Sequence, residues 1–566
     1  MRLESIHGVL VVLVSVILSL TTSTLATPTH NRNASQPYAP FLSDCPTDKP
    51  LTRPADSISE DEALYTIKRK AKASIALEAW LKKTDPRLPT SNLPSIGLTT
   101  SGGGYRSLLT GAGIIRAFDA REDKQLPTSG LLQSLTHSCS LSGGAWLTSS
   151  IGGNGFPTIS SLQNALWRKS FQAPLYIPYE NGSTFRSSFL SAYDKILDDI
   201  NSKTKAGFQA TITDLWGRLL SYQLLQGPDG GVATRLSNAP DEDYWKNHEA
   251  PYPIITALGV NEGLCKPRTR AFQYEFHPYE FGSWDPGVAA FARTKYLGTS
   301  MMNGKPAIPG ICIQNFDNLG HVFGTSSNLF DEACVNSKKN QVSMKSQIST
   351  MEKLFPSLAP LFHDAKEQRK ESLYSKYPNP WKGSAASPAV QKDTDILLVD
   401  GGLSMQNNPV WPLLHPHRPL DVIIVNDNSA DTPTNYPNGS ELRRTYEQAK
   451  ESGLTRMPYI PTADVFVAKG MDKRASFFGC EEKEKITLVY LPNTPFWYNS
   501  GTPTMKLEYT HKQVDGMIEN GMYIATQGND AEWPFCLGCA ITLKTGAATP
   551  SACRPCLQRY CYKEKG

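Results

Sequence analysis

The sequence predicts an α/β fold in which helices flank a central, mostly parallel sheet. The order of its elements carries this prediction. A short apolar run, a tight turn of small residues and a helical stretch follow one another at 93–120 and again at 135–150. Such alternation of strands and helices is typical of parallel sheets. Two further apolar runs, at 395–399 and 422–425, have the length and composition of buried strands.

Composition supports a globular chain. Of its 566 residues, 40% are hydrophobic and 19% are charged, which is sufficient for a large core and excludes a disordered chain. The formal net charge is only +4. So small a charge over this length, without a basic run, argues against a nucleic-acid partner.

Residues 1–26 predict a secretory signal peptide, because an apolar run at 8–20 is followed by small residues suited to cleavage near Ala26. A signal anchor is the alternative, but the run is short for a bilayer span. The last residues carry no hydrophobic tail, so we expect no lipid anchor there. We therefore expect a secreted, extracellular protein, either free or retained by a cell wall or envelope.

Sequons and cysteines fit the same compartment. The sequons at Asn33, Asn181 and Asn438 predict N-glycosylation. Five of the eleven cysteines form a cluster at 536–561, in which Cys-x-x-Cys spacing occurs twice. That spacing is typical of zinc ribbons, but behind a signal peptide disulfides are favoured. Because eleven is odd, at least one thiol stays unpaired or pairs between chains. Cys139, in a predicted buried strand, is the candidate.

The elements before the first strand divide into a lead-in and a helix. Residues 27–44 are rich in Pro, Asn, Ser and Thr and predict an extended segment, which Cys45 would anchor. Residues 45–566 show no internal boundary and predict a single domain. The first helix is expected at 60–83. Its predicted apolar face consists of Ala63, Ile67, Ala71, Ile75, Leu77, Trp80 and Leu81.

The first strand, at 93–100, leads into Gly102-Gly103-Gly104 and a helix at 108–120. Consecutive glycines before a helix let backbone N–H groups converge on an anion. A phosphate-binding loop is an alternative, but neither nucleotide-binding glycine pattern is present, and a plain turn is another. Arg106 follows the glycines. A guanidinium beside an anion hole suits a phosphate-bearing substrate, whereas a surface arginine is the simpler reading.

The second strand, at 135–141, leads into Ser142-Gly143-Gly144 and a helix at 143–150. α/β-hydrolases present their nucleophile on such a turn within a G-x-S-x-G pattern, since only small residues permit the strained conformation. Ser140 stands where that pattern has its first glycine. The alternative is that Ser142 only caps the helix. A nucleophile here would gain from the helix dipole, which favours negative charge.

The segment at 156–240, with a helix at 212–225, predicts an insertion that either caps the site or packs on the sheet as ordinary helices. Asp400 then ends the strand at 395–399 and precedes two glycines. α/β folds place their sites at the carboxyl ends of strands, although a strand-ending Asx turn is the alternative. With Ser142 and the glycines, Asp400 supplies the base that acyl transfer requires.

These motifs resemble those of a known family. Ser-Gly-Gly-Gly-Tyr-Arg at 101–106, Leu-Ser-Gly-Gly-Ala-Trp at 141–146 and Asp-Gly-Gly at 400–402, followed by Asn408-Pro409, are similar to motifs of the fungal lysophospholipases, also called phospholipases B. Segments 253–257 and 281–286 and the cysteine cluster extend the resemblance across 45–561. The resemblance implies a patatin-like or cytosolic-phospholipase-like fold with cap-like insertions and a disulfide-rich C-terminus.

The resemblance also implies a mechanism. Ser142 would be the nucleophile and Asp400 its base in a Ser–Asp dyad, with Arg106 at the substrate phosphate. The oxyanion donors would be Gly103, Gly104 and Gly143. The implied reaction, without metal or cofactor, is hydrolysis of fatty acyl esters of lysophospholipids, and of diacyl phospholipids as an extension, through an acyl-serine. These substrates lie in membranes or micelles, so peripheral contact with a lipid surface is expected.

Two alternatives remain open. A Ser-His-Asp lipase or esterase would have the same chain order, with His415, His417 or His511 as the third member. A secreted, non-enzymatic wall protein would need neither Ser142 nor Asp400.

Overall fold

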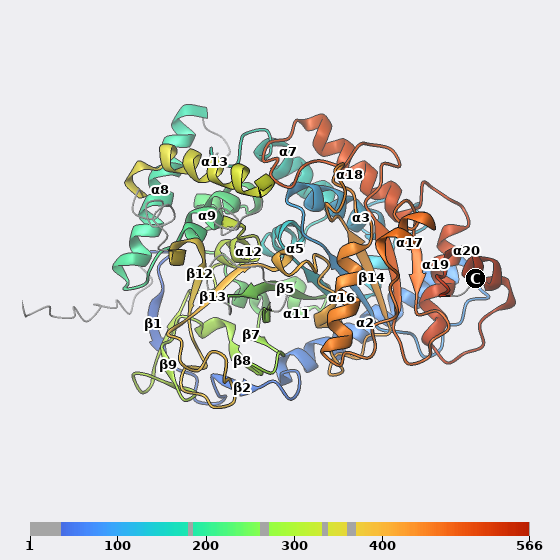
Figure 1. Cartoon of the computed structure of the whole chain (residues 1–566), viewed down its shortest axis with the longest axis horizontal. Helices are drawn as coiled ribbons and strands as arrows, with labels where there is room; N and C mark the ends of the chain where they lie inside the picture. Colours follow the sequence, from blue (N-terminus) through green and yellow to red (C-terminus); the bar gives the residue numbers. More distant parts are fainter. Residues whose placement is uncertain (1–35, 179–184, 261–270, 331–337, 359–369, 565–566) are drawn as a thin grey trace, which may run out of the picture.

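The computed structural model describes residues 36–178, 185–260, 271–330, 338–358 and 370–564 (Figure 1). The predicted signal peptide and the sequons at Asn33 and Asn181 lie outside these ranges. Within them, no helix has an apolar stretch that would reach across a lipid bilayer.

The α/β prediction is confirmed, and the central sheet of twelve strands is mixed. Five neighbouring strands are parallel: β16 (Thr487–Pro492), β14 (Val422–Asp427), β3 (Ile96–Thr100), β4 (Leu135–Ser140) and β5 (Tyr252–Gly259). Antiparallel strands extend both edges: β15 (Ser476–Phe478) beyond β16, and β6 (Gln273–Phe276), β7 (Glu280–Ser283), β8 (Ala290–Arg293) and β2 (Thr52–Pro54) beyond β5. The expectation of a mostly parallel sheet therefore holds for its centre alone.

Two strands join the sheet outside this order. β13 (Asp395–Asp400) pairs antiparallel with both β5 and β12 (Ser375–Pro378). Two small ribbons complete the strands: β1 (Phe41–Asp44) with β11 (Ile311–Gln314), and β9 (Met301–Met302) with β10 (Lys305–Pro306).

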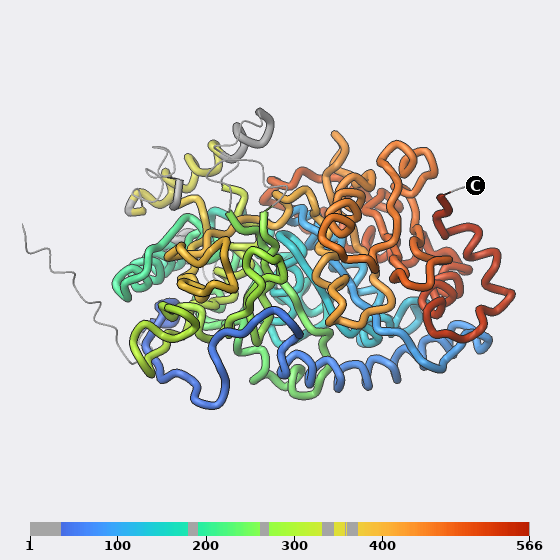
Figure 2. Tube along the Cα trace, turned by 60° about the horizontal axis from the view of Figure 1, so that its bottom comes forward, coloured from blue at the N-terminus to red at the C-terminus, as the bar shows by residue number. Residues whose placement is uncertain are grey.

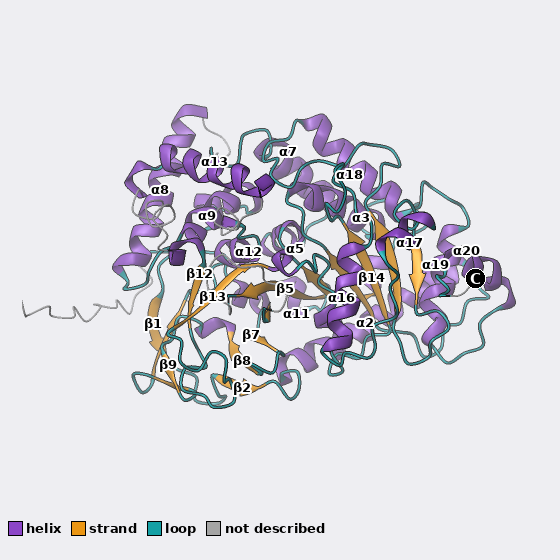
Figure 3. Ribbon diagram, in the orientation of Figure 1, coloured by secondary structure: helices purple, strands orange, loops and turns teal. Residues whose placement is uncertain are grey.

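Helices cover both faces of the sheet (Figure 3). Alternate residues of β14 point into different cores, since Ile424 belongs to one buried cluster and Ile423 and Val425 to another. Helices that pack into the larger core include α3 (Tyr105–Phe118), α5 (Gly143–Gly153), α9 (Ile212–Leu224), α12 (Leu319–Ser326) and α18 (His511–Ala525). Helices that pack into the other core are α11 (Asp243–Lys246), α15 (Trp411–Leu414), α16 (Ser440–Glu451) and α17 (Ala463–Ala468). The other helices are α2 (Glu60–Thr84), α4 (Leu131–Ser134), α6 (Ile159–Leu162), α7 (Arg168–Ser170), α8 (Phe185–Lys205), α10 (Pro228–Gly231), α13 (Lys338–Leu354), α19 (Trp533–Ile541) and α20 (Arg554–Tyr560).

Helix α2 forms where the sequence predicts it, but part of its predicted buried face is exposed. Figure 2 shows the chain from β1 through α2 following the lower edge of the molecule. Ile67 and Ile75 are 67% and 71% exposed. The buried face instead includes Glu62 and Arg69, whose charges are satisfied inside. Arg69 donates hydrogen bonds to five backbone carbonyls, so a polar side chain occupies a position that hydrophobicity alone assigns to solvent.

Most cysteines in the described ranges form disulfides. Cys45 is bonded to Cys312 and anchors the lead-in, as predicted. In the C-terminal cluster, Cys536–Cys556 and Cys539–Cys553 join α19 to α20, and Cys561 pairs with Cys480. The disulfide interpretation of the Cys-x-x-Cys pairs is thus confirmed. Cys139 is a buried free thiol, also as predicted.

The predicted insertion is mostly packed into the helical layer. Every residue of α9 is buried, and a Cβ on its Gly217 would collide with the backbone of Gly320 in α12. Helix α8 lies farther out, next to the end of α13, where the rings of Tyr193 and Phe355 stack 4.8 Å apart (Figure 1).

Candidate active site

The candidate site lies where β4 and β13 meet. β4 pairs with β5 up to Ile255, opposite Ser140, and β13 pairs with the same strand from Gly259 down to Ala257, opposite Asp400. The other edge of β5 is already occupied there by β6. β4 and β13 therefore approach each other end to end along one edge of β5. The turns that follow the two strands lie against each other, since a Cβ on Gly401 would be 2.6 Å from the Leu141 side chain.

Ser142 occupies a strained turn, as predicted. Its φ and ψ are 51° and −119°, a conformation that residues other than glycine rarely adopt, and its side chain is buried. The turn is tight: a Cβ on Gly143 would collide with the backbone of Gly104, and one on Gly144 with that of Thr100. Ser140 needs no glycine conformation, and its hydroxyl lies 2.7 Å from that of Thr148.

Asp400 ends β13 as predicted, but that strand is antiparallel to β5. The Asp400 Oδ1 atom accepts a hydrogen bond from the Gly402 N–H at 2.7 Å, and its side chain is buried. The Asx turn proposed as the alternative is thus present as well. It fixes the carboxyl group without excluding a further role.

The C-terminal end of α12 holds both turns in place, which the sequence did not reveal. The Ser326 hydroxyl accepts a hydrogen bond from the Ser142 N–H at 2.9 Å and donates one to Thr256 O at 2.7 Å. Two residues later, Asn328 O accepts the Asp400 N–H at 2.9 Å. No sequence pattern marks Ser326, because its contacts join segments about 180 positions apart.

The glycine turn after β3 lies against Ser142. A Cβ on Gly102 would be 3.1 Å from Ser142 Cβ, and Gly103 and Gly104 both have positive φ. In the hydrogen bonds formed by the described residues, the N–H groups of Gly103, Gly104 and Gly143 have no acceptor. Three N–H groups without acceptors beside a serine hydroxyl are what a developing oxyanion requires.

Asn407, which the sequence analysis did not single out, ties the glycine turn to the segment after Asp400. Its backbone carbonyl accepts the Gly102 N–H at 3.2 Å, and its side-chain amide donates back to Gly102 O at 3.2 Å. The Asn407 N–H donates to Glu441 Oε2 at 2.9 Å. Glu441 thus supports the glycine turn through one intermediate residue.

Arg106 is buried behind the glycine turn. Its Nε donates to Asn428 O at 2.9 Å, and its two Nη atoms donate to Thr502 O and Thr504 Oγ1. Burial lowers the pKa of the guanidinium to about 10, so it stays charged at neutral pH. The surface-arginine alternative is wrong.

A narrow pocket opens beside Ser142 and Gly104. Its wall is largely apolar and contains two indole rings. The other lining residues are Trp146, Trp216, Ser327, Leu329, Phe330, Gln347, Thr504, Met505 and Leu507. Trp216 comes from α9 in the predicted insertion and Gln347 from α13. In the described ranges, no three His, Cys, Asp or Glu side chains are grouped as ligands for a metal ion.

A pair of carboxyl groups beneath the site predicts a pH-dependent stability. Burial, reinforced by neighbouring carboxylates, raises the pKa of Glu441 from 4.5 to about 8 and that of Asp431 from 3.8 to about 7. At a pH between the ordinary pKa of each group and its raised pKa, the folded protein binds more protons than the unfolded chain. Its stability therefore falls as the pH rises from about 4 to 8. Thermal unfolding at pH 5 and pH 8 measures this loss.

Glu441→Gln is the matched variant, because glutamine can still accept the Asn407 N–H but does not titrate. We expect its melting temperature to fall less between pH 5 and pH 8 than that of the wild type. Equal pH dependence in the two proteins would show that Glu441 is not the responsible group.

Comparison with known proteins agrees with the geometry. Residues 96–565 match the family described as lysophospholipase catalytic domain. Lysophospholipase 2 of Aspergillus fumigatus is 34% identical over 563 residues, covering 94% of each chain. Lysophospholipase 1 of Saccharomyces cerevisiae is 34% identical over 590 residues, covering 96% of this chain and 87% of its own.

The fold is similar to that of human GIVD cytosolic phospholipase A2. The TM-score is 0.67 at 16% sequence identity, and the match covers 89% of this chain and 72% of the human one. The end-to-end strands, the serine turn and the match over most of the chain lead to one assignment: this chain belongs to the lysophospholipase family.

Proposed function

We propose that this chain hydrolyses the fatty acyl ester of lysophospholipids, releasing a free fatty acid and a glycerophospho-alcohol. Diacyl phospholipids are a second substrate class in this proposal. The observation that carries it is Ser142, held in a strained turn beside three N–H groups without acceptors, at one end of a largely apolar pocket. The apolar lining suits an acyl chain, and the ester carbonyl would lie at Ser142.

The proposed reaction uses a Ser–Asp dyad. Asp400 accepts the proton of Ser142 Oγ as that oxygen attacks the ester carbonyl. The Gly103, Gly104 and Gly143 N–H groups stabilise the oxyanion. The tetrahedral intermediate expels the glycerophospho-alcohol, which takes up the proton, and water then cleaves the acyl-serine with Asp400 again as base.

Arg106 is assigned to the substrate phosphate in this proposal. Three of its five N–H groups bind the protein, which leaves one on each Nη atom for a phosphate oxygen. The guanidinium also lies against Gly103, where a Cβ would be 2.7 Å from Nη2, so a phosphate bound there would lie near the oxyanion donors.

A histidine-dependent triad is disfavoured by the surroundings of Ser142. No histidine is among the residues that line its pocket. The His415 ring stacks on Trp284, with centroids 3.8 Å apart, and His511 is exposed at the start of α18.

Secretion is part of the proposal, and the four disulfides in the described ranges support it. N-glycosylation at Asn33, Asn181 and Asn438 and peripheral contact with lipid surfaces belong to it as well. Of the three sequons, Asn438 lies within the described ranges, just before α16, and is partly exposed.

The test is release of fatty acid from lysophosphatidylcholine by the purified protein in the presence of a chelator. We expect wild type, His415→Ala and His511→Ala to release fatty acid at similar rates, since neither histidine takes part in the dyad. Loss of activity in a folded histidine variant would favour the triad. No release by wild type, together with no labelling by a serine-reactive phosphonate, would favour the non-enzymatic alternative.

A further inference from the structure

The hydrogen-bonding groups in the pocket beside Ser142 are nearly all committed. The Ser327 hydroxyl accepts the indole N–H groups of Trp146 and Trp216 at 2.9 and 3.0 Å and donates to Phe323 O. The Thr504 hydroxyl accepts an N–H of Arg106 at 3.2 Å. Apart from the catalytic end, these polar side chains therefore have little to offer a substrate.

Gln347 is different. It lies on α13, is 8% exposed, and lines this pocket, yet its Oε1 atom has no hydrogen-bond partner among the described residues. The neighbouring buried positions of the helix, Ile348 and Met351, are apolar. A buried carbonyl oxygen without a partner is costly, so its presence in the pocket beside Ser142 indicates a partner that arrives with the substrate.

We propose that Gln347 is a specificity-determining residue that recognises monoacyl substrates by accepting a hydrogen bond from their free glycerol hydroxyl. The inference rests on the proposed function and extends it to the choice between substrates. In a lysophospholipid the hydroxyl is on the carbon next to the one that carries the ester. A substrate with its ester at Ser142 therefore places this hydroxyl within a few bonds of Ser142, beside the pocket that Ser142 and Gln347 both line.

The proposed hydrogen bond distinguishes monoacyl from diacyl lipids. A diacyl phospholipid has a second ester at that carbon, which offers no donor to Gln347 Oε1. Headgroups can supply donors as well: the primary ammonium of phosphatidylethanolamine is one, and phosphatidylcholine has none. Comparing substrates with and without each group separates the two sources.

The experiment measures kcat/KM for 1-acyl lysophosphatidylcholine and for its analogue without the glycerol hydroxyl, both below their critical micelle concentrations. We expect wild type to favour the hydroxyl-bearing lipid by about tenfold to a hundredfold. Gln347→Met, similar in shape but without an amide, should bring this ratio close to one, mainly by slowing the hydroxyl-bearing lipid. Gln347→Glu, which retains an acceptor, should keep part of the preference.

Ser346→Ala, on the exposed face of the same helix, is the matched control and should keep the wild-type ratio. A ratio near one in wild type, or a ratio unchanged in Gln347→Met, would overturn the proposal. An equal loss on both lipids would show that Gln347 is only structural. A wild-type preference for lysophosphatidylethanolamine over lysophosphatidylcholine that Gln347→Met abolishes, without any preference for the hydroxyl, would assign the carbonyl to the headgroup ammonium and overturn the proposal.

The proposed function is tested separately, by whether wild type hydrolyses lysophosphatidylcholine at all. Binding of the same two lipids is measured with Ser142→Ala, with and without Gln347→Met. Quenching of tryptophan fluorescence reports this binding and requires no turnover. The hydroxyl preference should appear there too. Equal affinities for both lipids would overturn the inference even if the enzyme proves active.

Discussion

Alanine at position 142 is expected to lower kcat for lysophosphatidylcholine hydrolysis by about 10⁴-fold or more. The pocket and the N–H groups of Gly103 and Gly104 would remain in the variant, so substrate should still bind. What is lost is the oxygen that attacks the ester, and the other two hydroxyls of the pocket, on Ser327 and Thr504, are engaged in hydrogen bonds within the protein. The effect should therefore fall on kcat, with KM nearly unchanged.

Asp400→Asn should cost about as much, because an amide cannot accept the serine proton. Its side-chain carbonyl can still accept the Gly402 N–H, so the turn should persist. If the two residues act as one unit, the double variant will lose no more than either single variant. Additive losses would contradict the dyad.

The measurements are single-turnover and steady-state fatty acid release, with phosphonate labelling as a second readout. Ser140→Ala is the control, because that serine lies two residues away, is equally buried and bonds to Thr148 instead of facing the pocket. It should keep most of its activity. Substantial release by Ser142→Ala would remove Ser142 as the nucleophile.

The parts of the site that sequence could predict are those fixed by local geometry. Small residues around Ser142 and the glycines at 102–104 specify tight turns wherever they occur, and an apolar run before each specifies a buried strand. These constraints act within about ten residues. For this reason both strand–turn–helix units formed at the expected positions.

The other parts depend on contacts between distant segments. The sequence of β13 does not reveal whether it runs with β5 or against it, and the site needs the antiparallel arrangement for Asp400 to end opposite Ala257. Ser326 and Gln347 lie on helices with no distinguishing motif, and only the fold brings Ser326 to the Ser142 turn and Gln347 to the pocket. The exposed Ile67 shows the converse: hydrophobicity alone misassigned one side of α2.

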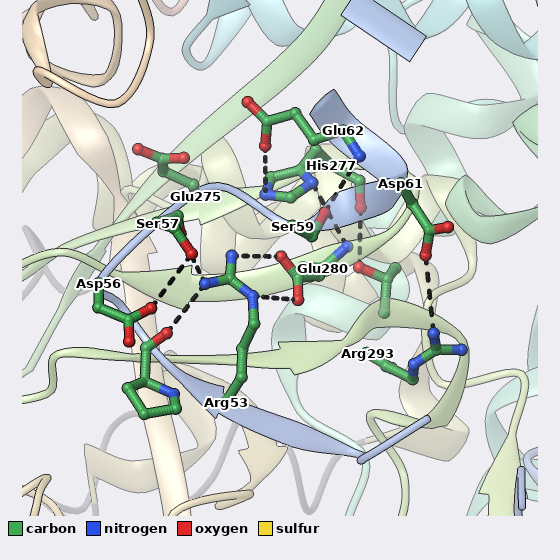
Figure 4. A network of polar contacts seen from close by, with 12 residues as sticks. Arg53, Asp56, Ser57, Ser59, Asp61, Glu62, Glu275, His277, Glu280 and Arg293 are labelled. Carbon is green, nitrogen blue, oxygen red and sulfur yellow. Dashed lines mark hydrogen bonds and ion pairs between the residues drawn. The ribbon is translucent and has the colours of Figure 1, made fainter. Parts of the chain in front are cut away.

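The second large effect concerns stability and involves Arg418. Its guanidinium bonds to Glu62 at 2.6 Å and to Glu275 at 2.8 Å, and all three side chains are essentially unexposed. Figure 4 shows Glu62, from the first turn of α2, pointing toward His277, with Glu275 nearby. The ion group of Arg418, Glu62 and Glu275 joins α2 to β6 and to the loop after α15.

Arg418→Ala should lower the free energy of unfolding by about 3–5 kcal/mol, because it leaves two buried carboxylates without a cation. Burial raises the pKa of Glu275, and burial together with the charge of Arg418 holds the pKa of His277 well below its usual range, so His277 adds no second cation to the group in the wild type. For a chain of this size the melting temperature should fall by about 3–5 °C. Chemical and thermal unfolding measure the loss.

Two further variants identify the cause of the stability lost in Arg418→Ala. Arg53→Ala breaks the nearby ion pair with Glu280. The Arg53 and Glu280 side chains are 19% and 9% exposed, and we expect the free energy of unfolding to fall by about 1 kcal/mol or less. Combining Arg418→Met with Glu62→Gln and Glu275→Gln removes every charge of the group and should recover much of the stability lost in Arg418→Ala. If the triple variant is as unstable as Arg418→Ala, lost hydrogen bonds and packing determine the cost. If it is more stable, the cost comes from the unpaired carboxylates, and the ion group contributes less to stability than its burial suggests.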